Sequence, residues 1–134
     1  MIWHICFHPR LKHHWWGRKY GHVSIAGYHD DTWVHIDVRR ETTDVLSIYR
    51  YEDTHNYLDY LVKNTTVVRF GPAKAGVNAR AFLRPMSCVI FVKHTLGIRS
   101  RALLPDGLLR DLLRDYDVEI INDTQTGGTD TGPA

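Results

Sequence analysis

Residues 22–38 read HVSIAGYHDDTWVHIDV, which is two alternating segments joined by a short polar stretch. The segments 22–28 and 32–38 are rich in β-branched and aromatic side chains, and the three polar residues 29–31 lie between them. Short polar spacing of this kind is typical of a β-hairpin. We therefore predict two antiparallel strands here, and this hairpin determines how the rest of the fold is assembled.

The alternation of the hairpin decides which side chains share a face of the sheet. Its valines and isoleucines form one apolar face. The opposite face carries His22, Ser24 and Ala26 on the first strand, and Trp33, His35 and Asp37 on the second. A two-residue loop places Asp37 directly across from His22, and a four-residue loop places it on the diagonal. In either register an imidazole and a carboxylate lie within several Å of each other.

A second signal lies in residues 84–98, RPMSCVIFVKHTLGI, where Cys88 opens an apolar run that is expected to be a helix ending at Gly97. The unpaired N–H groups and the macrodipole of a helix N-terminus favour a thiolate at this position. Packing is the alternative, because an unreactive cysteine is often buried as a small hydrophobic residue. Together with an imidazole and a carboxylate, Cys88 would complete a nucleophile–base–orienter set.

The remaining segments predict further strands and helices around the hairpin. Strands are expected at 3–8, near 44–51, at 65–70 and at 118–121. Helices are expected at 51–64 and from Leu104-Pro105 onwards; the second of these would direct four leucines inward, at 108, 109, 112 and 113. We expect a single α+β domain over residues 1–121, with an antiparallel sheet packed by helices. Residues 122–134 are a low-complexity segment and are expected to be a flexible tail.

The composition is ordinary for a globular protein, with 43% hydrophobic residues, 24% charged residues and a net charge of +2 over 134 residues. This charge is too small to indicate binding to nucleic acid. No apolar run approaches the roughly 20 residues that a membrane span needs, and the N-terminus has no signal-peptide pattern. The two cysteines, Cys6 and Cys88, make no disulfide framework. No cofactor is expected.

The motifs GHVSIAG, TWVHIDV, SCVIFVKHTLGI and LLPDGLLRDLL together resemble the circularly permuted branch of the papain-like cysteine hydrolases. This branch contains the lecithin:retinol acyltransferase-like and NlpC-like proteins. In it a histidine opens a strand and the cysteine follows later, at the N-terminus of a helix. The resemblance covers roughly residues 20–115 and implies Cys88 as the nucleophile and His22 as the base. The third position falls on Asp37 or His35, and Asp37 is favoured because it faces His22 more closely in the tighter register.

The resemblance also implies a function and a setting. It implies a cysteine peptidase or amidase that cleaves an amide or ester bond, with a peptide of bacterial peptidoglycan as substrate. Small proteins of this kind are often carried by bacteriophages, so a tail-associated peptidase in the virion or in the host cytoplasm is expected. Trp15, Trp16 and Trp33 could wall a substrate groove, although tryptophan is commonly a core residue.

Two other readings stay open at this stage. One is a non-catalytic tail protein that reuses the fold and binds other virion proteins through loop 9–20 and the C-terminal tail. The other is a metal site, because His4, Cys6 and His8 share one strand face and His13 and His14 are near in sequence. No CxxC or HExxH signature supports the metal site.

Overall fold

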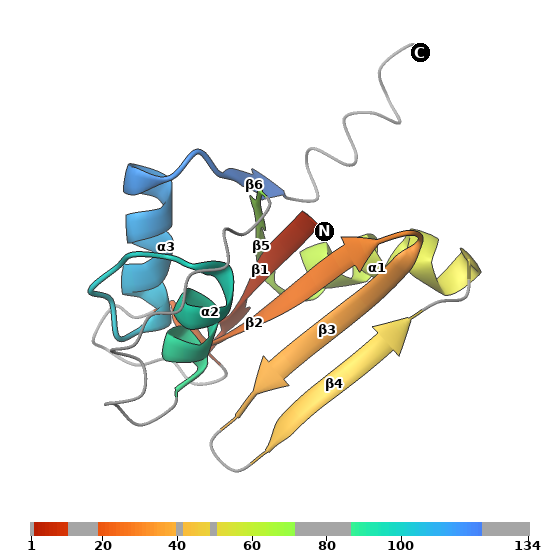
Figure 1. The fold of residues 1–134 in the computed structure, drawn as a ribbon, viewed down its shortest axis with the longest axis horizontal. Coiled ribbons are helices and arrows are strands. Elements are labelled where there is room, and N and C mark those ends of the chain that lie inside the picture. The colour runs from red at the N-terminus through yellow and green to blue at the C-terminus, as the bar shows by residue number, and fades with distance from the viewer. Residues whose placement is uncertain (1, 11–18, 40–41, 49–50, 72–86, 122–134) are drawn as a thin grey trace.

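The computed structural model describes residues 2–10, 19–39, 42–48, 51–71 and 87–121 (Figure 1). Its strands are β1 (Ile2–Pro9), β2 (Tyr20–His29), β3 (Thr32–Val38), β4 (Thr43–Ile48), β5 (Thr66–Phe70) and β6 (Glu119–Ile121). Its helices are α1 (Tyr51–Asn64), α2 (Cys88–Leu96) and α3 (Pro105–Asp115). The expected tail at residues 122–134 lies outside the described residues.

The strands form one antiparallel sheet in the order β4-β3-β2-β1-β5-β6. The predicted α+β architecture, an antiparallel sheet packed by helices, is therefore confirmed. The hairpin β2–β3 lies on one side of β1, and β5 lies on the other side. As a result β1 is a central strand, and its alternate side chains are buried on both faces of the sheet.

A two-residue turn at Asp30 and Asp31 closes the hairpin. Both residues have positive φ, 47° and 58°, as the central residues of a type I′ turn require. The resulting register pairs Ile25 with Ile36, so Asp37 lies diagonal to His22. The expectation that a two-residue loop would place these two directly opposite is wrong, because the turn starts one residue later than that register needs.

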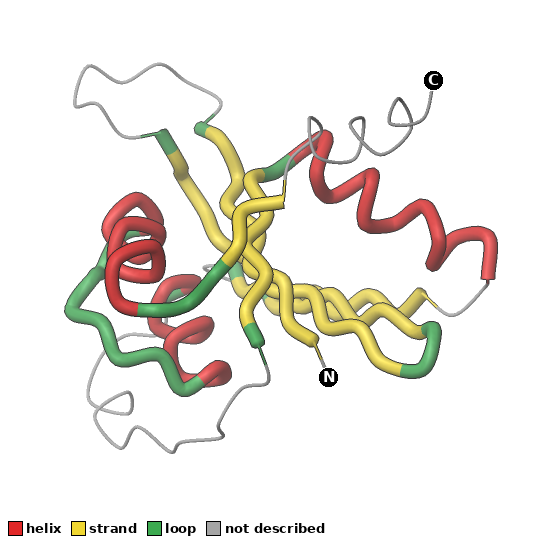
Figure 2. Tube along the Cα trace, turned by 90° about the horizontal axis from the view of Figure 1, so that it is seen from above, coloured by secondary structure: helices red, strands yellow, loops and turns green. Residues whose placement is uncertain are grey.

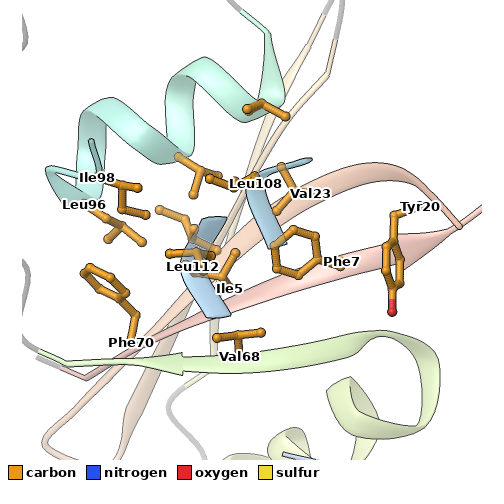
Figure 3. Packing of buried hydrophobic residues seen from close by; sticks show 13 residues of the cluster. Ile5, Phe7, Tyr20, Val23, Val68, Phe70, Leu96, Ile98, Leu108 and Leu112 are labelled. Atoms are coloured by element: carbon orange, nitrogen blue, oxygen red, sulfur yellow. The ribbon is translucent and has the colours of Figure 1, made fainter. Parts of the chain in front are cut away.

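The two faces of the sheet are covered by different helices (Figure 2). Helices α2 and α3 pack on the face that carries Ile5, Phe7, Val23 and Ile25 (Figure 3). Helix α1 covers the opposite face, where Cys6, Ala26 and Trp33 are buried together with the α1 residues Tyr57 and Leu61. The face predicted to be polar is therefore a second, smaller core. Trp33 belongs to this core and is not available to wall a groove.

The helices begin and end where local chemistry predicts. Pro105 occupies the first turn of α3, and Gly97 ends α2 in a left-handed conformation with φ 68°. Leu108 and Leu112 are fully buried, as predicted, and Leu109 packs against the core. Leu113 is 49% exposed, so its predicted inward direction is wrong: α3 turns this position away from the sheet. Among the described residues, none of the helices combines the length and apolar character needed to cross a bilayer.

Candidate functional site

The first turn of α2 places the Cys88 thiol next to the sheet. Ser87 is the N-cap: its extended backbone has φ −121°, and its Oγ accepts from the Ile90 amide at 3.3 Å. Cys88 is half-buried, and α2 contacts both β2 and β3. The start of β2, the end of β3 and the start of α2 therefore meet in one corner of the molecule (Figure 1).

His22 stands between the thiol and a carboxylate. Its side chain lies close enough to Cys88 for the two groups to shift each other's pKa, and its Nε2 contacts Oδ1 of Asp37 directly. The second carboxylate oxygen of Asp37 accepts from Arg39 Nη2 at 3.3 Å. The side chains of His22 and Asp37 are 23% and 14% exposed, so the pair is sheltered but reachable from solvent. The structure thus brings together three residues that the sequence proposed for one site.

The electrostatics of this cluster favour separated charges. The nearby Cys88 thiol is the largest influence on the pKa of His22, and together with the contact to Asp37 it outweighs burial and raises that pKa. Burial opposes ionisation of Cys88, but His22 and the backbone amides of Val23 and Val89 lower the pKa of the thiol. Burial likewise opposes ionisation of Asp37, while His22 and Arg39 lower its pKa. These directions are those of a thiolate–imidazolium pair held by a carboxylate.

His35, the other candidate for the third position, takes part in a different contact set. Its Nε2 is 2.8 Å from Ser24 Oγ, and its Nδ1 contacts the Tyr57 hydroxyl. Ser24 Oγ is also 2.8 Å from His8 Nε2. Asp37 and not His35 is therefore the residue that contacts His22. The two share one face of β3, but His35 lies opposite Ala26, further along the hairpin from His22, where it contacts Tyr57 of α1.

His8 is the neighbour of this site that sequence reasoning did not place there. It is the direct cross-strand partner of His22, and the two ring centroids are 5.1 Å apart. Burial, followed by the charge of His22, lowers the pKa of His8 to about 4. The alternation of residues 3–8 put His8 on a polar face, but only the pairing of β1 with β2 brings it beside His22.

The alternative metal set of His4, Cys6 and His8 is not assembled among the described residues. Cys6 is fully buried, its thiol faces the backbone oxygen of His4, and burial raises its pKa to about 12. Within the described part of the chain, the set that could hold a metal ion is instead His8, His22 and Asp37, whose ligand atoms lie within 4.8 Å of one another. His13, His14, Trp15, Trp16 and most of loop 9–20 lie outside the described residues.

Comparison of the chain with protein-family models, with curated proteins and with solved structures finds no match. The functional reading therefore depends on the geometry of the site.

Proposed function

We propose that this protein is a thiol-dependent hydrolase in which Cys88 is the nucleophile, His22 the general base and acid, and Asp37 the residue that orients His22. The observation that carries this proposal is the position of His22, which contacts Asp37 directly and lies near the Cys88 thiol at the start of α2. A nucleophile, a base and an orienting group in this sequence of contacts are the parts that covalent hydrolysis needs.

The reaction proceeds in two steps. His22 takes the Cys88 proton, and the thiolate attacks the carbonyl carbon of an amide or ester, forming a C–S bond. The tetrahedral intermediate collapses to a thioester as His22 returns the proton to the departing amine or alcohol. His22 then takes a proton from water, the hydroxide displaces the sulfur, and the acid leaves with Cys88 restored. The first turn of α2 stabilises the negative charges of these steps, and the Cys88 amide is the proposed oxyanion donor.

The substrate class and fold family are proposed from the resemblance of the motifs around His22 and Cys88 to permuted papain-like hydrolases. An antiparallel sheet with the base at the start of a strand and the thiol at the start of a later helix is compatible with that fold. The proposed substrate is a peptide amide of the bacterial cell wall, and the proposed setting is a phage tail. Digestion of purified peptidoglycan, followed by mass analysis of the released peptides, tests the substrate class.

Acylation of the thiol tests the chemistry without knowledge of the substrate. Incubation with p-nitrophenyl acetate should release p-nitrophenol and leave an acetyl group on Cys88, detectable by mass and removable by hydroxylamine as a thioester. C88A should lose both signals. Cys6 is an internal control, because it is fully buried and burial raises its pKa to about 12; C6S should acylate like the wild type. Ester cleavage that persists in C88A would overturn the proposal.

The same variant separates catalysis from a purely structural role. A non-catalytic tail protein should keep its fold and its assembly in C88A and should show no Cys88 acylation in the wild type. A catalytic tail protein should also assemble as C88A, but should lose the acyl intermediate.

A further inference from the structure

A row of hydrogen-bonded polar side chains runs from the candidate site to helix α1. We call it the Ser24 chain, and its members are His8 of β1, Ser24 of β2, His35 of β3 and Tyr57 of α1. Ser24 is the centre of the row: it is 1% exposed, and its Oγ is 2.8 Å from Nε2 of both His8 and His35. The mechanism proposed above uses none of these four residues.

The chemistry of a hydroxyl limits how protons can be arranged in this chain. Ser24 has one O–H, so when it links the two imidazoles in one chain it donates to one of them and accepts an N–H from the other. Such a chain can run in two directions. In the first, His35 donates from Nε2 to Ser24, and Ser24 donates to Nε2 of His8. In the second, all of these directions are reversed.

The Tyr57 hydroxyl decides between the two arrangements. Tyr57 is buried, and burial raises its pKa far above neutral, so it keeps its proton. In the first arrangement Nδ1 of His35 is a free acceptor, and Tyr57 donates to it. In the second arrangement His35 itself donates to Tyr57, and the tyrosine proton would need another acceptor; the side-chain contacts of the described residues supply none. A buried donor without an acceptor destabilises the fold, so the first arrangement has the lower free energy.

We propose that the Ser24 chain holds His8 in a single neutral tautomer, with its proton on Nδ1, and thereby makes His8 a positioning residue for His22. This inference builds on the proposed function of Cys88, His22 and Asp37. His8 and His22 are direct cross-strand partners, and their ligand atoms lie within 4.8 Å of a carboxylate oxygen of Asp37. A His8 ring that takes a second proton would repel the His22 imidazolium and compete with it for Asp37.

The surroundings of His8 favour the same neutral ring. The titratable and charged groups that act on it are His22 of β2, Asp37 and His35 of β3, and Arg39, which follows β3. Asp37 alone favours a proton on His8, while burial and the remaining groups oppose it. A hydrogen bond donated by Ser24 to Nε2 of His8 further disfavours protonation of His8, because it occupies the lone pair that a second proton would need.

Imidazole nitrogen NMR on the intact chain reads the tautomers directly. At pH 7 the wild type should show His8 neutral with its proton on Nδ1 and His35 neutral with its proton on Nε2, with signals assigned from H8Q and H35Q. In Y57F the donor to His35 is absent, so His8 should show a mixture of both tautomers. Y60F is the matched control: it removes a hydroxyl from the same helix, at an exposed tyrosine that stacks on Tyr57, and should give the wild-type spectrum.

Alkylation of Cys88 by iodoacetamide tests the positioning role. In Y57F the rate at pH 7 should fall roughly twofold to tenfold, the range expected for the loss of one neutral hydrogen bond, and Y60F should react at the wild-type rate. If the spectrum of the wild type shows the His8 proton on Nε2, the proposed tautomer is wrong. If Cys88 of Y57F is alkylated at the wild-type rate, His8 has no positioning role. If instead the wild-type thiol alkylates only as an ordinary cysteine, the proposed ion pair fails, whatever the tautomer of His8.

Discussion

Asp37 uses both of its carboxylate oxygens, one for His22 and one for Arg39. Two charged partners on two oxygens prevent rotation of the carboxylate, and so they define the orientation of the imidazole ring. The same two partners lower the pKa of Asp37 against the opposing effect of burial. At the scale of single residues, the direction of the His22 ring is therefore determined by a side chain that is 15 positions away in the sequence.

Replacement of Asp37 by asparagine should weaken this arrangement without changing its shape. The amide is uncharged and cannot accept at both positions, so the pKa of His22 should fall and that of the Cys88 thiol should rise. The loss of a charge-assisted hydrogen bond predicts a fall of roughly tenfold to a hundredfold in the rate of Cys88 alkylation at pH 7. D59N makes the same chemical change on an exposed position of α1 and should keep the wild-type rate. Equal rates in D37N and the wild type would show that Asp37 does not support the pair.

Helix α2 is capped at both ends, and its capped start carries the proposed nucleophile. Ser87 caps its N-terminus, and the backbone N–H of Gly97 bonds to the carbonyls of His94 and Lys93 at its C-terminus. Val89, Ile90, Val92 and Leu96 are buried, and the last turn carries Lys93 and His94, basic residues that suit the helix dipole. The cap therefore positions the thiol and stabilises the helix at the same time.

Two variants of Ser87 should separate these effects. S87A removes the acceptor for the Ile90 amide and should lower the free energy of unfolding by about 1 kcal/mol, measured by urea denaturation. S87D keeps an acceptor at the cap and should retain most of the stability. Its negative charge lies next to Cys88, however, so S87D should raise the pKa of the thiol and slow its alkylation at pH 7. Loss of stability in S87D equal to that in S87A would contradict the capping role.

At the scale of the whole molecule, two histidines beside the cores are shielded from solvent: His4 is buried and His8 is partly buried. His4 is 3% exposed and packs against Trp33, and burial, followed by the charge of Arg69, lowers its pKa from 6.5 to about 4. His8 shows the same change, again chiefly through burial. A buried neutral imidazole resists protonation in the folded state. Acid should therefore lower the free energy of unfolding of the whole molecule through these two residues.

Stability should therefore decline as the pH falls from about 6.5 to about 4. In this range the unfolded chain binds protons at His4 and His8 that the folded chain does not, so the free energy of unfolding rises with pH. The contribution of His4 corresponds to about 3 kcal/mol over this range. Urea denaturation at a series of pH values should show a decline that is smaller in H4F. H29N, at an exposed histidine that ends β2, should follow the wild type, and a flat wild-type profile would contradict the prediction.

Above pH 6.5 the proposed ion pair should contribute little further slope. A folded thiolate–imidazolium pair binds one proton, and in the unfolded chain a neutral histidine and a protonated cysteine also bind one proton between their ordinary pKa values of 6.5 and 9.0. The two states then exchange no protons at this pair. Between these two pH values the slope of the titration should therefore report on groups other than the proposed ion pair.

The sequence by itself determined the elements and their faces. Alternation in residues 22–38, helical spacing in 51–64 and the proline at position 105 are local signals, and local backbone preference is enough to read them. The same signals proposed Cys88, His22 and Asp37, because a helix start and a strand face each place one side chain. Only the tertiary structure decided that β1 pairs with β2, that the hairpin register sets Asp37 diagonal to His22, and that α1 buries the second face. These outcomes depend on contacts between segments far apart in the chain, whose energies come from mutual burial and leave no periodic trace in either segment alone.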